Sequence, residues 1–173
     1  RQEIACWDII GKMYHQPIYK LIGGKVNNRL RSYSYLYPTD NENADTFYAD
    51  PFASASVAEK YIELGFTAVK FDPAGAYTIF DGHQPSMADL DRSELFCKEI
   101  RKAIGNKADI LFGTHGQFTT SAACRLARRL ECYDPLWFEE PIPPDNPEEM
   151  AKVAKATTKP VSYTHLRAHE TDR

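Results

Sequence analysis

The sequence predicts an α/β protein in which helices cover a parallel β-sheet. Two observations carry this prediction: a short strand pattern is followed by an amphipathic helix pattern four times in a row, and all but one of the connections are short. Repeated strand–helix units form parallel sheets with helices packed outside them. No strand pattern is followed by G-x-G-x-x-G or G-x-x-x-x-G-K-S/T, so an open nucleotide-binding sheet lacks its fingerprint. A complete (β/α)8 barrel takes about 250 residues, and four units make about half of one.

The first two units are predicted from alternation and capping signals. Residues 31–37 (RSYSYLY) alternate serine with larger, β-favouring residues, which predicts a strand. A polar loop follows, and Ser56 with Glu59 has the spacing of a capping box, which predicts that a helix begins there. That helix ends at Gly65. Residues 66–71 (FTAVKF) then form the second strand.

The remaining units follow a long loop over residues 72–89. Apolar spacing and helix-end signals predict, in order, a helix ending at Gly105, a strand over 108–113, a helix around 123–130, a strand over 136–139 and a helix that begins after Asn146. Asn146 is followed by a proline and two acids, the usual composition of a capped first turn.

Composition excludes several classes of function. The chain has 173 residues, 43% hydrophobic and 26% charged, with a formal net charge of -3, which predicts a packed core and no field that would attract nucleic acid. No apolar run approaches the roughly 20 residues that cross a membrane. The four cysteines contain no C-x-x-C pair, so we expect free thiols in a reducing compartment, the cytoplasm.

Both ends of the chain are unusual. Residues 1–10 read as a helix that is apolar on most sides, and we expect such a helix to be buried. Because a globular domain rarely begins inside a buried helix, we interpret the chain as a fragment. Residues 162–173 (SYTHLRAHETDR) have no periodicity and resemble the translated read-through of a sequencing adapter. We therefore predict a non-native tail there.

Charged residues gather where the predicted strands end. Lys70 and Asp72 close the second strand and share one face, and His115 follows the third. Glu139 and Glu140 close the fourth strand, so one carboxylate faces inward and its neighbour outward. Carboxyl ends of parallel strands meet at one edge, where ligand sites lie. Converging lysine, histidine and glutamate side chains at such an edge indicate a proton-transfer site.

Structural alternatives remain open for these residues. Lys70 would form a salt bridge with Asp72 or Glu140 if it only closes a strand end. His115 precedes a glycine in a turn, and a single loop histidine is commonly structural. Glu139 and Glu140 lie between Trp-Phe and Pro-Ile-Pro-Pro, which disfavours solvent exposure of both.

Three stretches resemble a known family. These are IACWDIIGKMYHQPIYKLIGGKV, GFTAVKFDP and DPLWFEEPIPPDN, which span residues 1 to about 161. They resemble the mandelate racemase and muconate lactonising branch of the enolase superfamily, whose members have an α+β capping domain followed by a modified (β/α)8 (TIM) barrel. The resemblance implies a partial barrel: residues 1–29 end the capping domain and lead into the barrel, and residues 30–161 form its first half.

The resemblance also implies a magnesium ion that holds the substrate carboxylate. A base removes the proton α to that carboxylate, and the metal stabilises the resulting enediolate. Family members place acidic ligands on three successive strand ends. Glu139 matches the fourth-strand ligand, whereas the third-strand position is Gly113, which cannot coordinate a metal through a side chain. The fifth-strand acid is expected after Val161, where the predicted tail begins.

Catalytic roles follow from the same resemblance. His115, in Thr-His-Gly-Gln, resembles the histidine of galactonate-type sugar acid dehydratases that protonates the departing 3-hydroxyl. Lys70 is expected to neutralise the substrate carboxylate or enediolate. Asp72 replaces the second lysine of the racemases' Lys-x-Lys pattern, and we expect it, Tyr77 and Glu140 to contact substrate. The family's later-strand histidine base is absent from this sequence.

The predicted function of the full-length parent is magnesium-dependent dehydration of a sugar acid, converting an aldonate to a 2-keto-3-deoxy acid. The alternatives are a racemase, epimerase or cycloisomerase of the same superfamily, or a catalytically inert fragment. We expect the chain alone to be inactive, and the parent to be a homo-oligomer with a small-molecule substrate and no nucleic acid or membrane partner.

Overall fold

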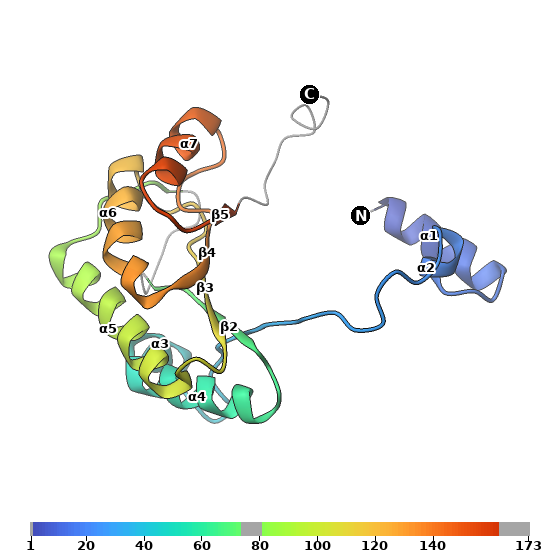
Figure 1. Ribbon diagram of the computed structural model, residues 1–173, viewed down its shortest axis with the longest axis horizontal. Coiled ribbons are helices and arrows are strands. Elements are labelled where there is room, and N and C mark those ends of the chain that lie inside the picture. The colour runs from blue at the N-terminus through green and yellow to red at the C-terminus, as the bar shows by residue number, and fades with distance from the viewer. Residues whose placement is uncertain (1, 74–80, 163–173) are drawn as a thin grey trace. The chain divides into compact units, whose positions relative to one another are not determined.

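The computed structural model describes residues 2–73 and 81–162 (Figure 1). The chain divides into two compact units, residues 1–31 and 32–173. Tyr77 lies outside the described residues, as do residues 163–173 of the predicted tail. All four cysteines are free, as the sequence predicts. Within the described residues, no helix has the length and apolar character needed to cross a membrane.

The first unit contains α1 (Gln2–Met13) and α2 (Ile18–Leu21). The expected burial of its first helix is not found: Ile4 and Ile9 are 69% and 57% exposed, and Gly11 is the buried residue of α1. The physical reason lies in the size of the unit. Because α2 is a single short helix, the unit offers little surface of its own on which α1 can bury an apolar face.

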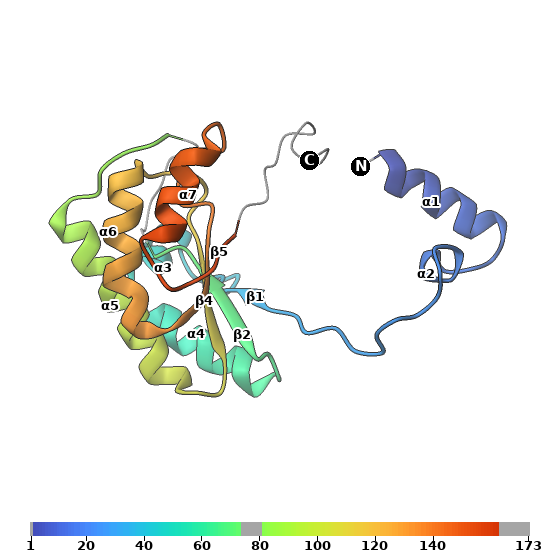
Figure 2. The ribbon, with the colours of Figure 1, turned by 45° about the horizontal axis from the view of Figure 1, so that its top comes forward.

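The second unit is built on five parallel strands in the order β1-β2-β3-β4-β5. Their bounds are β1 Ser34–Tyr35, β2 Ala68–Phe71, β3 Asp109–Gly113, β4 Pro135–Glu139 and β5 Val161–Ser162. Helices lie along one face of this sheet in both Figure 1 and Figure 2. Doubly wound sheets reverse their strand order and carry helices on both faces, so this arrangement is a segment of a (β/α)8 barrel.

The helices of the second unit begin at identifiable caps. They are α3 Ala44–Ala49, α4 Pro51–Glu63, α5 Met87–Ile104, α6 Thr120–Leu130, the 3-10 turn η1 Glu131–Tyr133 and α7 Pro147–Lys155. Ser86 and Asp89 form a capping box at α5, Thr119 caps α6, and Asn146 caps α7 as predicted. Gly105 ends α5 with a φ of 53°.

The predicted start of α4 is wrong. The helix begins at Pro51, and the Asp50 side chain accepts a hydrogen bond of 2.8 Å from the Phe52 amide. Ser56 is an exposed residue inside the helix. The Ser-x-x-Glu spacing occurs within helices as well as at their starts, whereas Asp followed by Pro is the combination that starts this one. The predicted polar loop before it contains α3, which Asn43 caps.

The two edge strands also differ from the sequence prediction. The first predicted strand, residues 31–37, is reduced to two paired residues in β1. Val161 and Ser162 pair with β4 as β5, and the Ser162 carbonyl accepts a hydrogen bond of 2.9 Å from the Glu140 amide. Ser162, placed by the prediction in the non-native tail, is therefore part of the sheet.

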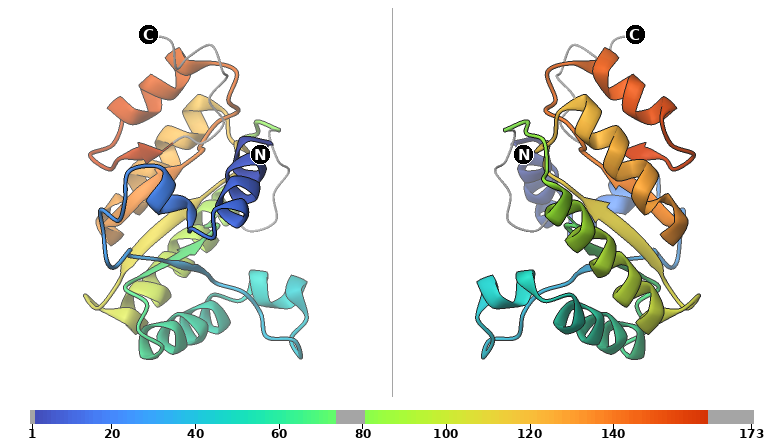
Figure 3. Two further views of the ribbon diagram at one scale, coloured as in Figure 1. Left: turned by 90° about the vertical axis from the view of Figure 1, so that its right-hand side faces the viewer. Right: turned by 90° about the vertical axis from the view of Figure 1, so that its left-hand side faces the viewer.

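The core lies between the sheet and its helices. Phe71, Phe112 and Phe138 come from three successive strands, and the register places Phe112 beside both of the others. Their rings meet edge to face, with centroids 5.5 Å and 6.3 Å apart. The right-hand view of Figure 3 shows α5 and α6 covering these strands. This buried layer sets the carboxyl ends of β2, β3 and β4 level with one another.

Candidate active site

A cavity of about 280 Å³ opens at the carboxyl ends of the strands. It is lined by Tyr35, Tyr37, Tyr48, Lys70, Asp72 and His115. Three of the predicted site residues, Lys70, Asp72 and His115, therefore share one cavity, as alternation along β2 and the place of His115 after β3 predict. The other three lining residues are tyrosines from β1, its following loop and α3, which the sequence analysis did not assign to a site.

Lys70 forms an ion pair with Glu139. Lys70 Nζ lies 2.6 Å from Glu139 Oε2, and the two side chains are 12% and 15% exposed. The same oxygen accepts a hydrogen bond of 3.1 Å from Trp137 Nε1. Lys70 Nζ also lies 5.8 Å from the centre of the Tyr33 ring, within the range of a cation–π contact. The ammonium is thus held at the rim by a carboxylate and an aromatic ring.

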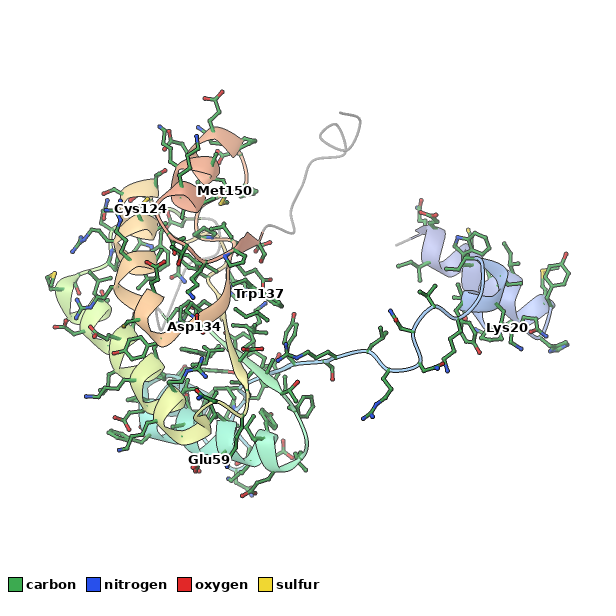
Figure 4. All side chains as sticks on the ribbon, in the orientation of Figure 1. Lys20, Glu59, Cys124, Asp134, Trp137 and Met150 are labelled. Atoms are coloured by element: carbon green, nitrogen blue, oxygen red, sulfur yellow. The ribbon has the colours of Figure 1, made fainter. Side chains whose placement is uncertain are left out.

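Trp137 places this ion pair on the strand face opposite the helices. In Figure 4 it is labelled on the side of β4 away from α5 and α6. Its ring meets the Tyr33 ring edge to face, with centroids 5.7 Å apart. Since Glu139 follows Trp137 by two residues, both side chains project from the same face. Glu139 therefore faces inward, as the sequence predicts.

Asp72 connects His115 with Gln117. His115 Nδ1 lies 3.4 Å from Asp72 Oδ2, and Gln117 Nε2 donates to both carboxylate oxygens at 3.3 Å. The Asp72 side chain is 6% exposed and that of His115 is 32% exposed. A carboxylate in this position accepts a hydrogen bond and therefore favours the tautomer with its proton on Nδ1. Asp72, predicted to contact substrate, therefore has protein partners on both sides.

Gln117 is a site residue that the sequence analysis missed. It is fully buried, and its Oε1 has no hydrogen-bond partner among the described residues. Burying an amide whose oxygen has no hydrogen-bond partner costs free energy, which the two hydrogen bonds from Nε2 to Asp72 offset. The available sequence signal was its place in Thr-His-Gly-Gln, two residues beyond His115 in the turn that follows β3.

Hydrogen bonds join the turns that follow β3 and β4. Thr114 Oγ1 donates to the carbonyls of Glu139 and Glu140, at 2.9 Å each. The Gly116 amide donates to the Glu140 carbonyl at 2.6 Å. His115 and Glu140 have φ values of 55° and 48°, a left-handed conformation that is costly for residues other than glycine. These bonds hold both residues in that strained conformation at the rim.

The tyrosines give the cavity a wall with aromatic faces and hydroxyl groups. The Tyr35 and Tyr37 ring centroids are 5.2 Å apart. Burial, followed by the nearby Tyr37 and Tyr61, raises the pKa of Tyr48, so its hydroxyl remains a donor to a higher pH than that of a free tyrosine. Alternation in RSYSYLY was the available signal for this wall, because it puts Tyr33, Tyr35 and Tyr37 on one face.

Comparison with known proteins assigns the family. A family model described as enolase C-terminal domain-like matches residues 53–165. The chain belongs to the enolase C-terminal domain-like family. It is 34% identical over 92% of its length to a D-xylonate dehydratase from Haloferax volcanii, and 35% identical over 83% to a D-gluconate/D-galactonate dehydratase from Picrophilus torridus. It covers 38% and 34% of these two relatives, so it spans well under half of their length.

A solved structure agrees with the family assignment and with the fold. The chain superposes on a mandelate racemase/muconate lactonizing enzyme from Sulfitobacter sp. with a TM-score of 0.88 and 53% sequence identity. The match covers 94% of this chain and 41% of that protein. The predicted resemblance to this branch of the enolase superfamily is therefore confirmed, and so is the partial barrel.

The predicted magnesium ligands are not assembled within the described residues alone. Magnesium takes oxygen ligands in octahedral geometry. Within residues 2–73 and 81–162, no three histidine, cysteine, aspartate or glutamate side chains are arranged to hold a metal ion. Glu139, the predicted ligand, is paired with Lys70, and Gly113 supplies no side-chain ligand. Magnesium dependence of a complete enzyme stays a prediction.

Of the two remaining predicted substrate contacts, the structure describes Glu140 and not Tyr77. Glu140 is 4% exposed and is not one of the residues that line the cavity. A substrate contact by Glu140 stays a prediction, and the predicted contact by Tyr77 lies outside the described residues.

Proposed function

We propose that this chain provides the general-acid half of the active site of a sugar acid dehydratase. The observation that carries the proposal is the His115–Asp72 pair in the cavity that Lys70 also lines. Similarity to enzymes named as xylonate, gluconate and galactonate dehydratases supports the class of substrate. A hydroxyl-bearing tyrosine wall suits a polyhydroxylated acid, because each hydroxyl both donates and accepts.

Lys70 would neutralise negative charge on the substrate. Loss of the α-proton from a carboxylate produces a dianionic enediolate, which requires fixed positive charge nearby. An ammonium has three N–H donors, and the Glu139 contact uses one of them. Because the ion pair with Glu139 fixes the position of the Lys70 ammonium, we assign Lys70 the role of an electrostatic partner and not that of a base.

His115 would supply the proton that turns the 3-hydroxyl into water. In the imidazolium form both ring nitrogens carry protons, with Nδ1 facing Asp72 and Nε2 transferring its proton. The C2–H bond breaks towards a base that the described residues do not identify. The C3–O bond then breaks as the hydroxyl takes the proton from His115. The resulting enol becomes the 2-keto-3-deoxy acid, and the imidazole is left neutral.

A full-length enzyme that contains this chain tests the proposal. The purified enzyme is incubated with aldonates, and the 2-keto-3-deoxy acid is measured. Replacing His115 with Asn should reduce product formation at least about hundredfold, the usual contribution of a general acid. His83→Asn is the matched control, since His83 lies outside the cavity lining and should leave the rate unchanged. Wild-type turnover by His115→Asn would refute the acid role, and epimerised substrate in place of dehydrated product would favour an epimerase.

A further inference from the structure

Lys70 reaches its partner by crossing the neighbouring strand. Lys70 is on β2 and Glu139 is on β4, and β3 lies between these two strands. Strands two apart in a sheet are separated by about 10 Å. Even so, Lys70 Nζ lies 2.6 Å from Glu139 Oε2. The lysine side chain must therefore pass over a residue of β3.

That residue is Gly113. The register places Gly113 directly beside Glu139. A Cβ atom added at Gly113 would lie 2.5 Å from Lys70 Cε, 3.3 Å from Nζ and 3.8 Å from Cδ. The first distance is far inside van der Waals contact, and it involves the carbon that carries the ammonium, which the ion pair with Glu139 holds in place. Any residue other than glycine would therefore have to displace the side chain that carries the ammonium.

Backbone conformation does not explain a glycine at this position. Gly113 has strand geometry and is not one of the described glycines with positive φ. Strands favour residues with side chains, and an interior glycine weakens them. The remaining reason is space, and the space is occupied by Lys70.

We propose that Gly113 is a positioning residue, whose missing side chain lets Lys70 cross β3 and hold its ammonium on Glu139. The inference deepens the proposed function. The packing of Lys70 over Gly113 stands without that function, whereas the placement of the ammonium for catalysis rests on it. It also gives a physical reason for the absent metal ligand on β3. The volume next to Gly113 is filled by a cationic side chain, so Glu139 is neutralised by an amino acid of the chain.

A double-mutant cycle in the 173-residue chain tests the proposal without reference to activity. Gly113→Ala is made with Lys70 present and in a Lys70→Ala background, and unfolding in urea is followed for all four proteins. With Lys70 present, the unfolding equilibrium constant should rise at least about tenfold. In the Lys70→Ala background it should change less than about threefold, because the clash has been removed. Gly82→Ala, which meets Phe118 and not Lys70, is the control and should cost the same in both backgrounds.

The emission spectrum of Trp137 in the folded protein reports on the Lys70–Glu139 pair. A general loss of stability does not change this spectrum as long as the protein remains folded. Trp137 donates to the oxygen of Glu139 that Lys70 contacts, and Trp7→Phe removes the only other tryptophan. Gly113→Ala should shift the emission of the folded protein when Lys70 is present, and should leave it unchanged in the Lys70→Ala background. An equal cost in both backgrounds, or an unshifted spectrum with Lys70 present, would overturn the proposal. If Gly113→Ala does not fold, recovery of folded protein by adding Lys70→Ala supports it, and no recovery overturns it.

Discussion

Replacing Asp72 with Asn should slow dehydration and leave substrate binding intact. Asp72 is isosteric with Asn, so the change removes one negative charge from a side chain that is 6% exposed and lies 3.4 Å from His115 Nδ1. Gln117 Nε2 donates to both oxygens of Asp72. An amide at this position brings its own donors towards groups that already donate, so the variant loses acceptors as well as charge.

The size of the effect follows from the kind of contact. A hydrogen bond to a charged group contributes about 1.5–3 kcal/mol. The His115 side chain is 32% exposed, so solvent screening favours the lower half of that range. Loss of this contact corresponds to about tenfold to fiftyfold slower proton transfer, at 1.36 kcal/mol for each factor of ten.

Steady-state kinetics of the full-length enzyme separate the two roles considered for Asp72. If Asp72 positions His115, kcat falls by that factor and KM is nearly unchanged. If Asp72 contacts substrate, as the sequence analysis expects, KM rises instead. Asp109→Asn is a matched control, because Asp109 begins β3 and lies at the end of that strand opposite to the cavity. A wild-type kcat for Asp72→Asn would show that the His115–Asp72 contact has no part in the reaction.

Two further predictions concern stability, and urea unfolding checks both. Burial, and then the hydrogen bond to Glu94, raise the pKa of Tyr133 to about 12. An unfolded tyrosine ionises near pH 10, so this stabilisation is complete below pH 10 and is lost as the pH rises towards 12. Tyr133→Phe should therefore lose less stability than the wild type over that interval. Parallel curves of unfolding free energy against pH for the two proteins would contradict this. Asp50→Ala should lower the free energy of unfolding by about 1 kcal/mol, because Asp50 caps α4. Ser56→Ala should change the free energy of unfolding by less than about 0.5 kcal/mol. A larger loss for Ser56→Ala than for Asp50→Ala would instead support a helix that begins at Ser56.

Strand-end chemistry was the most predictable part of the molecule. Alternation has a period of two, so it places Lys70 with Asp72 and turns Glu139 inward without any knowledge of the tertiary structure. Parallel strands then bring their carboxyl ends to one edge, and His115 reaches the same cavity as Lys70. The sequence contains this information because it is local in the chain and repeated in each unit.

Contacts that depend on register or on shape were not predictable in the same way. The passage of Lys70 over Gly113 requires knowledge that β2, β3 and β4 are consecutive and level. The burial of Gln117 and the strained φ of His115 depend on how the turns after β3 and β4 meet. The exposure of α1 is a further case, because its apolar pattern predicts a face to be covered but not which surface covers it.

Deuterium incorporation by the His115→Asn enzyme tests the account most directly. In D2O, the variant should exchange the hydrogen at C2 of an aldonate for deuterium while forming no 2-keto-3-deoxy acid. That result is predicted because removal of the α-proton precedes the step that His115 serves. Loss of exchange together with loss of dehydration, while the protein remains folded, would contradict the account, since His115 would then act at the α-carbon.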